Sequence, residues 1–141
     1  MSHLTGKCLC GAVTYKAAAP PQSARYCWCR TCRYLAAGNA TVNVVFASDG
    51  FQIDGTTSDH VSVADSGNTM HRRFCTACGT HMFSEAEARP HLIIVRAGTL
   101  DDQSLVDPGS NIWLSEAPDW ARPDDRLVAF DAQPPVPPTT A

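Results

Sequence analysis

Seven cysteines in three short clusters are the residues of this sequence whose spacing indicates chemistry. The clusters are Cys8 and Cys10; Cys27, Cys29 and Cys32; and Cys75 and Cys78. An odd number of thiols cannot all pair in disulfides. Tetrahedral zinc with Zn–S bonds of about 2.3 Å holds its sulfur ligands roughly 3.8 Å apart, a separation that a tight C-x-C or C-x-x-C turn provides. We therefore expect each cluster to serve a single metal ion.

Two of the clusters have the form of zinc knuckles. Cys75 and Cys78 stand in "CTACG", where the glycine after C-x-x-C tolerates the positive φ that lets backbone N–H groups approach the thiolates. The stretch "CLCG" at 8–11 has a similar form. We predict that Cys8, Cys10, Cys75 and Cys78 form a closed structural zinc site that ties the start of the chain to its middle.

The third cluster, in "YCWCRTCR", supplies three thiols from one loop. Three ligands leave the fourth position of a zinc ion open, as in catalytic or ligand-binding sites. Flanking arginines can offset thiolate charge and bind substrate carboxylates; these are Arg25, Arg30 and Arg33. Trp28, between two of the cysteines, is predicted to form a wall of the site.

Two other interpretations of the three-cysteine loop remain open at this stage. A histidine could complete a second structural zinc site, and the available residues are His3, His60, His71, His81 and His91. Alternatively, Cys29 and Cys32 could be a redox pair, although the thioredoxin-like context of such a pair is a βαβ unit, whereas this chain shows strands without crossover helices.

Short runs of β-branched and aromatic residues between turn signals predict an all-β domain. The runs are 12–16, 40–46, 51–54, 60–64, 71–74, 80–83 and 91–98, and "LIIV" in the last is typical of a central strand. Asp49-Gly50 predicts a hairpin turn. We expect short helical turns after Cys32 and over 114–119, and the aromatic stretch 111–120 is expected to fold over the pocket.

Composition favours one soluble domain over residues 1–131, followed by a Pro-rich flexible tail over 132–141. The formal net charge of −3 gives no general attraction to nucleic acid or to an anionic membrane. No apolar run approaches the roughly 20 residues of a membrane span, and no secretory signal is evident, so we expect a cytoplasmic protein. The oligomeric state is left open.

Four stretches resemble the successive signatures of the glutathione-dependent formaldehyde-activating (GFA) family, which includes the domain of centromere protein V. They are "GKCLCGAVTYKA", "YCWCRTCR", "FCTACGTHMF" and "AGTLDDQSLVDPGSNIWLSEAPDW", and together they cover about residues 5–122. Many relatives have histidine where this chain has Trp28. Tryptophan in place of histidine removes a possible proton carrier and adds bulk beside the metal. The basic N-terminal extension of centromere protein V has no counterpart here.

The resemblance implies a β-tent fold with two zinc ions per chain, one at each of the two cysteine groups. It also implies a carbon-sulfur lyase that joins glutathione to formaldehyde, or cleaves such an adduct, with Cys27, Cys29 and Cys32 at the catalytic zinc. The expected partners are a small thiol such as glutathione and an aldehyde. His71, Arg72 and Arg73, just before the second knuckle, are further candidates for binding the carboxylates of such a thiol. The alternative is a non-catalytic zinc-binding module that binds or carries a thiol ligand.

Overall fold

A computed structural model describes residues 4–135 of the chain. The strands in this range are β1 (Leu4–Lys7), β2 (Thr14–Ala17), β3 (Ser23–Cys27), β4 (Thr41–Ala47), β5 (Phe51–Asp54), β6 (Thr57–Val63), β7 (Thr69–Cys75), β8 (His81–Ala86), β9 (Leu92–Arg96), β10 (Ser110–Ile112) and β11 (Val128–Ala129). The helical elements are short, namely α1 (Arg30–Leu35) and the 3-10 turns η1 (Ala97–Thr99), η2 (Gln103–Leu105) and η3 (Leu114–Glu116). The prediction of an all-β fold with few helical turns is confirmed.

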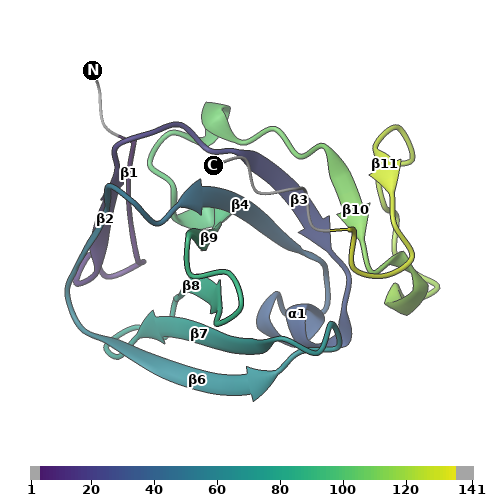
Figure 1. The fold of residues 1–141 in the computed structure, drawn as a ribbon, viewed down its shortest axis with the longest axis horizontal. Helices are drawn as coiled ribbons and strands as arrows, with labels where there is room; N and C mark the ends of the chain where they lie inside the picture. The colour runs from purple at the N-terminus through teal and green to yellow at the C-terminus, as the bar shows by residue number, and fades with distance from the viewer. Residues whose placement is uncertain (1–3, 136–141) are drawn as a thin grey trace.

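The strands form two sheets. One has the order β1-β2-β5, and the other has the order β11-β10-β3-β4-β9-β8-β7-β6. Pairing in the larger sheet is antiparallel except that β10 runs parallel to both β3 and β11. In Figure 1 the larger sheet curls, so that β3 and β4 lie above β7 and β6, with α1 at one end of the space between them.

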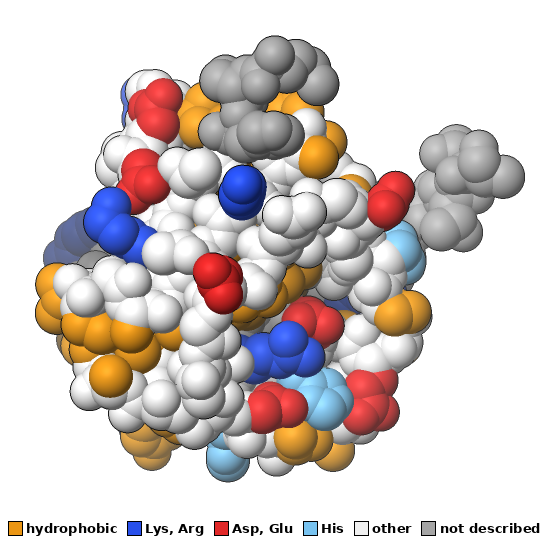
Figure 2. Space-filling view, turned by 90° about the vertical axis from the view of Figure 1, so that its left-hand side faces the viewer, with side chains coloured by type: hydrophobic (Ala, Val, Ile, Leu, Met, Phe, Trp, Pro, Cys, Tyr) orange, Lys and Arg blue, Asp and Glu red, His pale blue; other side chains and the backbone are white. Residues whose placement is uncertain are grey.

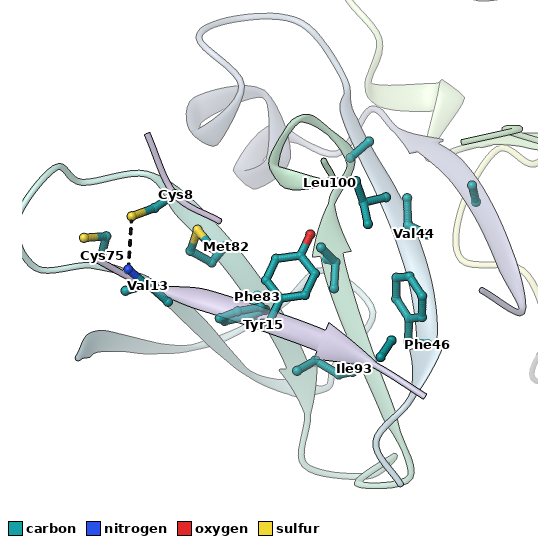
Figure 3. Packing of buried hydrophobic residues seen from close by; sticks show 14 residues of the cluster. Cys8, Val13, Tyr15, Val44, Phe46, Cys75, Met82, Phe83, Ile93 and Leu100 are labelled. Atoms are coloured by element: carbon teal, nitrogen blue, oxygen red, sulfur yellow. Dashed lines mark hydrogen bonds between the residues drawn. The ribbon is translucent and has the colours of Figure 1, made fainter. Parts of the chain in front are cut away.

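The main core lies between the smaller sheet and one face of the larger one. The ring of Tyr15 stacks on Phe51 at 5.3 Å between centroids and meets the edge of Phe83 at 5.4 Å. Val44 and Val95 are fully buried in the same cluster. Because Cys8 and Cys75 belong to this cluster as well (Figure 3), one cysteine group is continuous with the core.

The other face of the larger sheet is polar at its centre. Side chains alternate between the two faces of a strand, and Val44 and Val95 point into the core. Their neighbours Asn43 and Arg96 are paired across β4 and β9, and Asn43 is also paired with Arg25 of β3. Arg25, Asn43 and Arg96 therefore form a row across three adjacent strands on the face away from the core.

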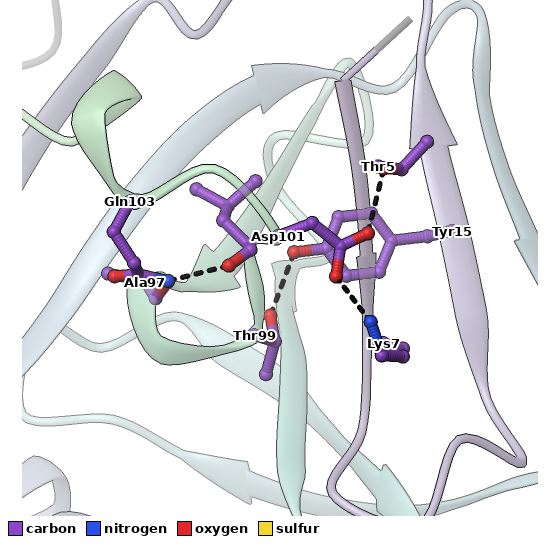
Figure 4. Close-up of polar contacts among 8 residues, drawn as sticks. Thr5, Lys7, Tyr15, Ala97, Thr99, Asp101 and Gln103 are labelled. Atoms are coloured by element: carbon purple, nitrogen blue, oxygen red, sulfur yellow. Dashed lines mark hydrogen bonds and ion pairs between the residues drawn. The ribbon is translucent and has the colours of Figure 1, made fainter.

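A polar network fixes the segment after β9 against the smaller sheet (Figure 4). Asp101 accepts hydrogen bonds from Thr5 Oγ1 at 2.8 Å and from Lys7 Nζ at 2.7 Å, while the hydroxyls of Tyr15 and Thr99 lie 2.8 Å apart. Gln103 Nε2 donates to two carbonyls of this segment. The network anchors the end of β1, directly before Cys8.

The prediction of a hairpin at Asp49-Gly50 is wrong. The turn exists, with Gly50 at φ 75°, but it joins β4 of the larger sheet to β5 of the smaller one. It therefore carries the chain between sheets rather than between paired strands. The predicted helical turns are present as α1 and η3.

The surface mixes charges of both signs. Figure 2 shows acidic, basic and histidine side chains interspersed on one face of the molecule. One such group in the structure is His71, whose ring nitrogens lie 2.6 Å from Asp59 and 2.8 Å from Glu87. Among the described residues, no helix combines the length and apolar character needed to cross a membrane.

Candidate functional site

The first cysteine group joins the turn after β1 to the turn between β7 and β8. The Sγ atoms of Cys8, Cys10, Cys75 and Cys78 all lie within 4.8 Å of one another. Cys10 Sγ is 3.6 Å from Cys8 Sγ and 3.8 Å from Cys75 Sγ. These separations match the roughly 3.8 Å between sulfur ligands of a tetrahedral zinc ion.

Both turns carry the backbone features of zinc knuckles. The N–H of Val13 donates to Cys8 Sγ at 3.3 Å, and the N–H of Ala77 donates to Cys75 Sγ at 3.4 Å. Gly11 and Gly79 have φ values of 82° and 77°, which glycine adopts without steric cost. The local sequence therefore positions each pair of thiols, and the fold brings the two pairs together.

The second cysteine group lies where β3 passes into α1. Cys27 is the last residue of β3, Cys29 caps the helix by accepting the N–H of Cys32 at 3.3 Å, and Cys32 lies in the helix. All three are buried, and their Sγ atoms lie within 4.8 Å of one another. A short segment thus brings three thiols together, and no distant part of the chain is needed to position them.

The electrostatics of this group favour thiolate at Cys32. Hydrogen bonds from Cys27 and Cys29 lower the pKa of the Cys32 thiol, and the positive charge of Arg96 lowers it further. The pKa of Cys27 is raised by its hydrogen bonds to the other two thiols and by burial. Without another positive charge the three thiols therefore share protons, and a divalent cation would allow all of them to ionise.

The three thiols line a cavity of about 60 Å³ under the curled sheet. Arginines from different elements share this lining, namely Arg25, Arg72, Arg89 and Arg96. Ile112, the last residue of β10, and Trp113, which follows it, also line the cavity; both belong to the stretch 111–120 that the sequence placed over the pocket. Trp113 is held there by its indole N–H, which donates to Gln133 Oε1 at 3.1 Å.

The structure brings only one of the flanking arginines named from the sequence into this lining. Arg25 lines the cavity, whereas the Arg30 guanidinium stacks over the ring of Tyr34 at 4.2 Å. Arg33 Nε donates to the Trp28 carbonyl at 3.1 Å. A role for Arg30 and Arg33 in substrate binding stays a prediction to which their positions lend no support.

Trp28 also lies away from the three thiols. It is 4% exposed and packs with Ala40 and Ala121, in a cluster separate from that of the cysteines. Its indole N–H donates to Asn111 Oδ1 at 3.0 Å. In this structure Trp28 supports the packing of β3 against β10 and does not line the cavity.

Sequence reasoning named Arg72, with His71 and Arg73, as a candidate for carboxylate binding, but it did not single out Arg89 and Arg96. Arg72, Arg89 and Arg96 come from β7, the turn before β9 and the end of β9, up to 71 positions from Arg25. Strand alternation alone would not have found Arg72 and Arg96, because each shares its face of the strand with an apolar residue, Arg72 with Met70 and Arg96 with Ile94. Their convergence depends on the sheet order, which the sequence does not reveal.

The donor chemistry of both groups is consistent with zinc, since each offers only thiols at suitable separations. Within residues 4–135, no histidine joins either group. His3 lies outside the described residues. The tail predicted over 132–141 stays a prediction: Ala132 and Gln133 contact Trp113, and residues 136–141 lie outside the described range.

Comparison with known proteins gives a family and a fold. The model of the family described as "Glutathione-dependent formaldehyde-activating enzyme" matches residues 3–116. A crystal structure of a Rhodobacter sphaeroides protein, a structural genomics target, superposes with a TM-score of 0.53. The two chains are 18% identical, and the match covers 89% of this chain and 98% of that one. No curated protein sequence matches the chain significantly.

Proposed function

This chain belongs to the glutathione-dependent formaldehyde-activating family, and from that premise we propose that it is a zinc-dependent carbon-sulfur lyase. The reaction would join a thiol such as glutathione to formaldehyde or a related aldehyde, or cleave the adduct. Its site would be an open zinc ion held by Cys27, Cys29 and Cys32. The other four cysteines would hold a structural zinc ion.

One observation carries this proposal: three buried thiols from a single segment meet at the wall of an arginine-lined cavity. A structural zinc site is normally closed by four protein ligands, whereas three ligands facing a cavity leave space for an exogenous one. The four-cysteine group, by contrast, is complete and continuous with the core. The two groups therefore fit different roles.

Bound zinc would lower the pKa of a thiol at its fourth position. The residues of this chain would do the rest. Cys27, Cys29 and Cys32 would hold the zinc ion at the cavity wall, and the apolar side chains of Ile112 and Trp113 in the lining would limit the access of water. In the forward direction a carbon–sulfur bond forms at the carbonyl carbon, and the proton released by the thiol ends on the carbonyl oxygen.

A specific observation favours the alternative, a module that binds a thiol ligand without turnover. Among the described residues that line the cavity there is no histidine, and the only carboxylate is that of the exposed Asp65. General acid-base catalysis needs a group within hydrogen-bond reach of the transferred proton. Without Asp65 as the general acid or base, the site would bind a thiol but would contribute little to proton transfer.

Rates of adduct formation from glutathione and formaldehyde test the enzymatic proposal against the uncatalysed rate in the same buffer. Zinc-loaded protein is expected to exceed that rate, and Cys32→Ala is expected to abolish the excess. Thr31→Ala, one residue away in α1, is the matched control and should retain it. Glutathione binding without any excess rate would favour the binding module. The absence of both glutathione binding and rate enhancement would contradict both functions.

A further inference from the structure

The geometry points to an anion-binding site within the same cavity. We propose that the guanidinium groups of Arg25, Arg72 and Arg96 bind the carboxylate of a ligand whose thiol reaches the three-cysteine group. The ligand class is therefore a thiol that carries a carboxylate a few bonds from its sulfur. The thiol part rests on the function proposed above, whereas the carboxylate part rests on the arginines alone.

The three arginines converge from three different strands of the larger sheet. Arg25 lies on β3, Arg72 on β7 and Arg96 on β9, and all line the cavity that the thiols line. Arg25 and Arg96 flank Asn43 in the strand register, and Asn43 Oδ1 accepts a hydrogen bond from Arg96. A second bond from Arg96 Nη2 to Ser84 Oγ, at 2.7 Å, holds its guanidinium in place.

These arginines retain unused hydrogen-bond donors. Arg72 is only 5% exposed, and its one side-chain hydrogen bond in the described structure runs from Nη1 to Ser62 Oγ at 2.8 Å. The Nε atoms of Arg25, Arg72 and Arg96 are all buried and have no partner among the described residues. Buried donors are normally satisfied, so three unpaired Nε atoms around one cavity indicate a missing acceptor.

The lining arginines have no carboxylate partner among the described residues. Arg73 pairs with Glu85 at 3.2 Å and Arg126 pairs with Asp124 at 2.8 Å, whereas no described ion pair involves a lining arginine. Burial lowers the pKa of Arg25 and of Arg96; the nearby cysteines act in the opposite direction, while the like charges of Arg89 on Arg25 and of Arg72 on Arg96 lower the pKa further. A bound carboxylate would relieve this repulsion and match the forked guanidinium geometry.

The dimensions of the cavity favour a compact ligand. Its volume of about 60 Å³ holds a few atoms beyond the reacting sulfur. A second cavity of about 120 Å³ shares Arg25, Ser84, Arg89 and Ile94 with the first. The carboxylate could thus belong to a small mercapto acid or to a larger thiol such as glutathione, whose remainder would extend into the second cavity.

Calorimetric titration of zinc-loaded protein with matched probes tests the proposal without any variant. The probes are 3-mercaptopropionate, its neutral analogue 3-mercapto-1-propanol, and propionate. We expect 3-mercaptopropionate to bind about 10- to 100-fold more tightly than the alcohol, because hydrogen bonds to a charged group are lost. Equal affinities for 3-mercaptopropionate and 3-mercapto-1-propanol would overturn the proposal, and this result does not depend on the folding of any variant.

Two variants of one strand localise the effect. Arg72→Gln is expected to bring the affinity for 3-mercaptopropionate down to that for the alcohol, and Arg72→Lys should restore only part of the difference. Arg73→Gln removes the same charge one residue away, from an arginine paired with Glu85, and should leave the difference intact. An equal loss in Arg73→Gln would also overturn the proposal, because the effect would then be long-range.

Other outcomes of these titrations distinguish failure of the anion site from failure of the proposed function. If propionate competes with 3-mercaptopropionate but no thiol-dependent change occurs at the metal, the anion site stands and the open thiol site fails. If both thiols bind equally at the metal, the thiol site stands and the anion site fails. Tighter binding of glutathione than of 3-mercaptopropionate would assign the carboxylate to a larger ligand, and the reverse order would assign it to a small mercapto acid.

Discussion

The indole N–H of Trp28 donates to Asn111 Oδ1 at 3.0 Å, so the tryptophan inside the three-cysteine motif is held by β10 rather than by the cavity. Asn111 is 2% exposed, and its Nδ2 donates to the carbonyl of Asp124 at 2.9 Å. Trp28 and Asn111 thereby connect the cysteine loop, β10 and the segment before β11. The tryptophan acts on the cysteine site through packing.

Replacing Trp28 with phenylalanine is expected to reduce stability and leave thiol binding unchanged. The substitution leaves the buried Asn111 Oδ1 without its donor, which costs about 1–3 kcal/mol in free energy of unfolding. Urea denaturation and a glutathione titration on the same samples measure both quantities. Weaker thiol binding with unaltered stability would show instead that Trp28 touches the ligand.

The two cysteine groups should respond differently to loss of one thiol. Cys75→Ser is expected to abolish cooperative thermal unfolding, because loss of a structural zinc ion removes a contribution comparable to the whole stability of a domain. Cys29→Ser should keep the fold and one zinc ion per chain. Circular dichroism and metal analysis distinguish the two, and unfolding of Cys29→Ser would contradict the division of roles.

The contribution of His71 to stability should depend on pH. Hydrogen bonds to Asp59 and, second, to Glu87 raise the pKa of His71 above its usual value of 6.5. The folded state therefore favours the imidazolium, so this stabilisation is complete below pH 6.5 and is lost as the pH rises through the raised pKa.

Urea unfolding of the wild type and of His71→Gln measures this effect. The difference in free energy of unfolding should be larger at about pH 6 than at about pH 9. His60→Gln, on the adjacent strand β6, is the control and should show no such trend, since His60 makes no ion pair within the described structure. A pH-independent difference for His71→Gln would mean that its carboxylate contacts do not form.

The cysteine pairs were predictable because their geometry is local. C-x-C and C-x-x-C turns ending in Gly11 and Gly79 bring thiols together within a few residues, whatever the rest of the fold does. The pairing of the two knuckles also followed, since a tetrahedral site requires four ligands. The seven sequence runs with strand character became strands for the same local reason.

The arginine cavity was less accessible to sequence reasoning. Arg25 stands in β3, whose "SARYC" alternates polar and apolar residues over only a few positions, and this strand was not predicted, nor were β1, β10 and β11. Arg72 and Arg96 meet Arg25 only because β7 and β9 take particular places in an eight-stranded sheet. Proximity to the cysteines in sequence favoured Arg30 and Arg33, yet the helix α1 turns them elsewhere.

The central claim is that Cys27, Cys29 and Cys32 hold a metal ion with an open position. Cobalt substitution tests it directly, because the visible absorption of cobalt reports on its ligands. We expect two metal ions per chain and a change in absorption at one of them when glutathione is added, with the change lost in Cys32→Ala. One metal ion per chain, three freely titratable thiols and no response to glutathione would contradict the claim.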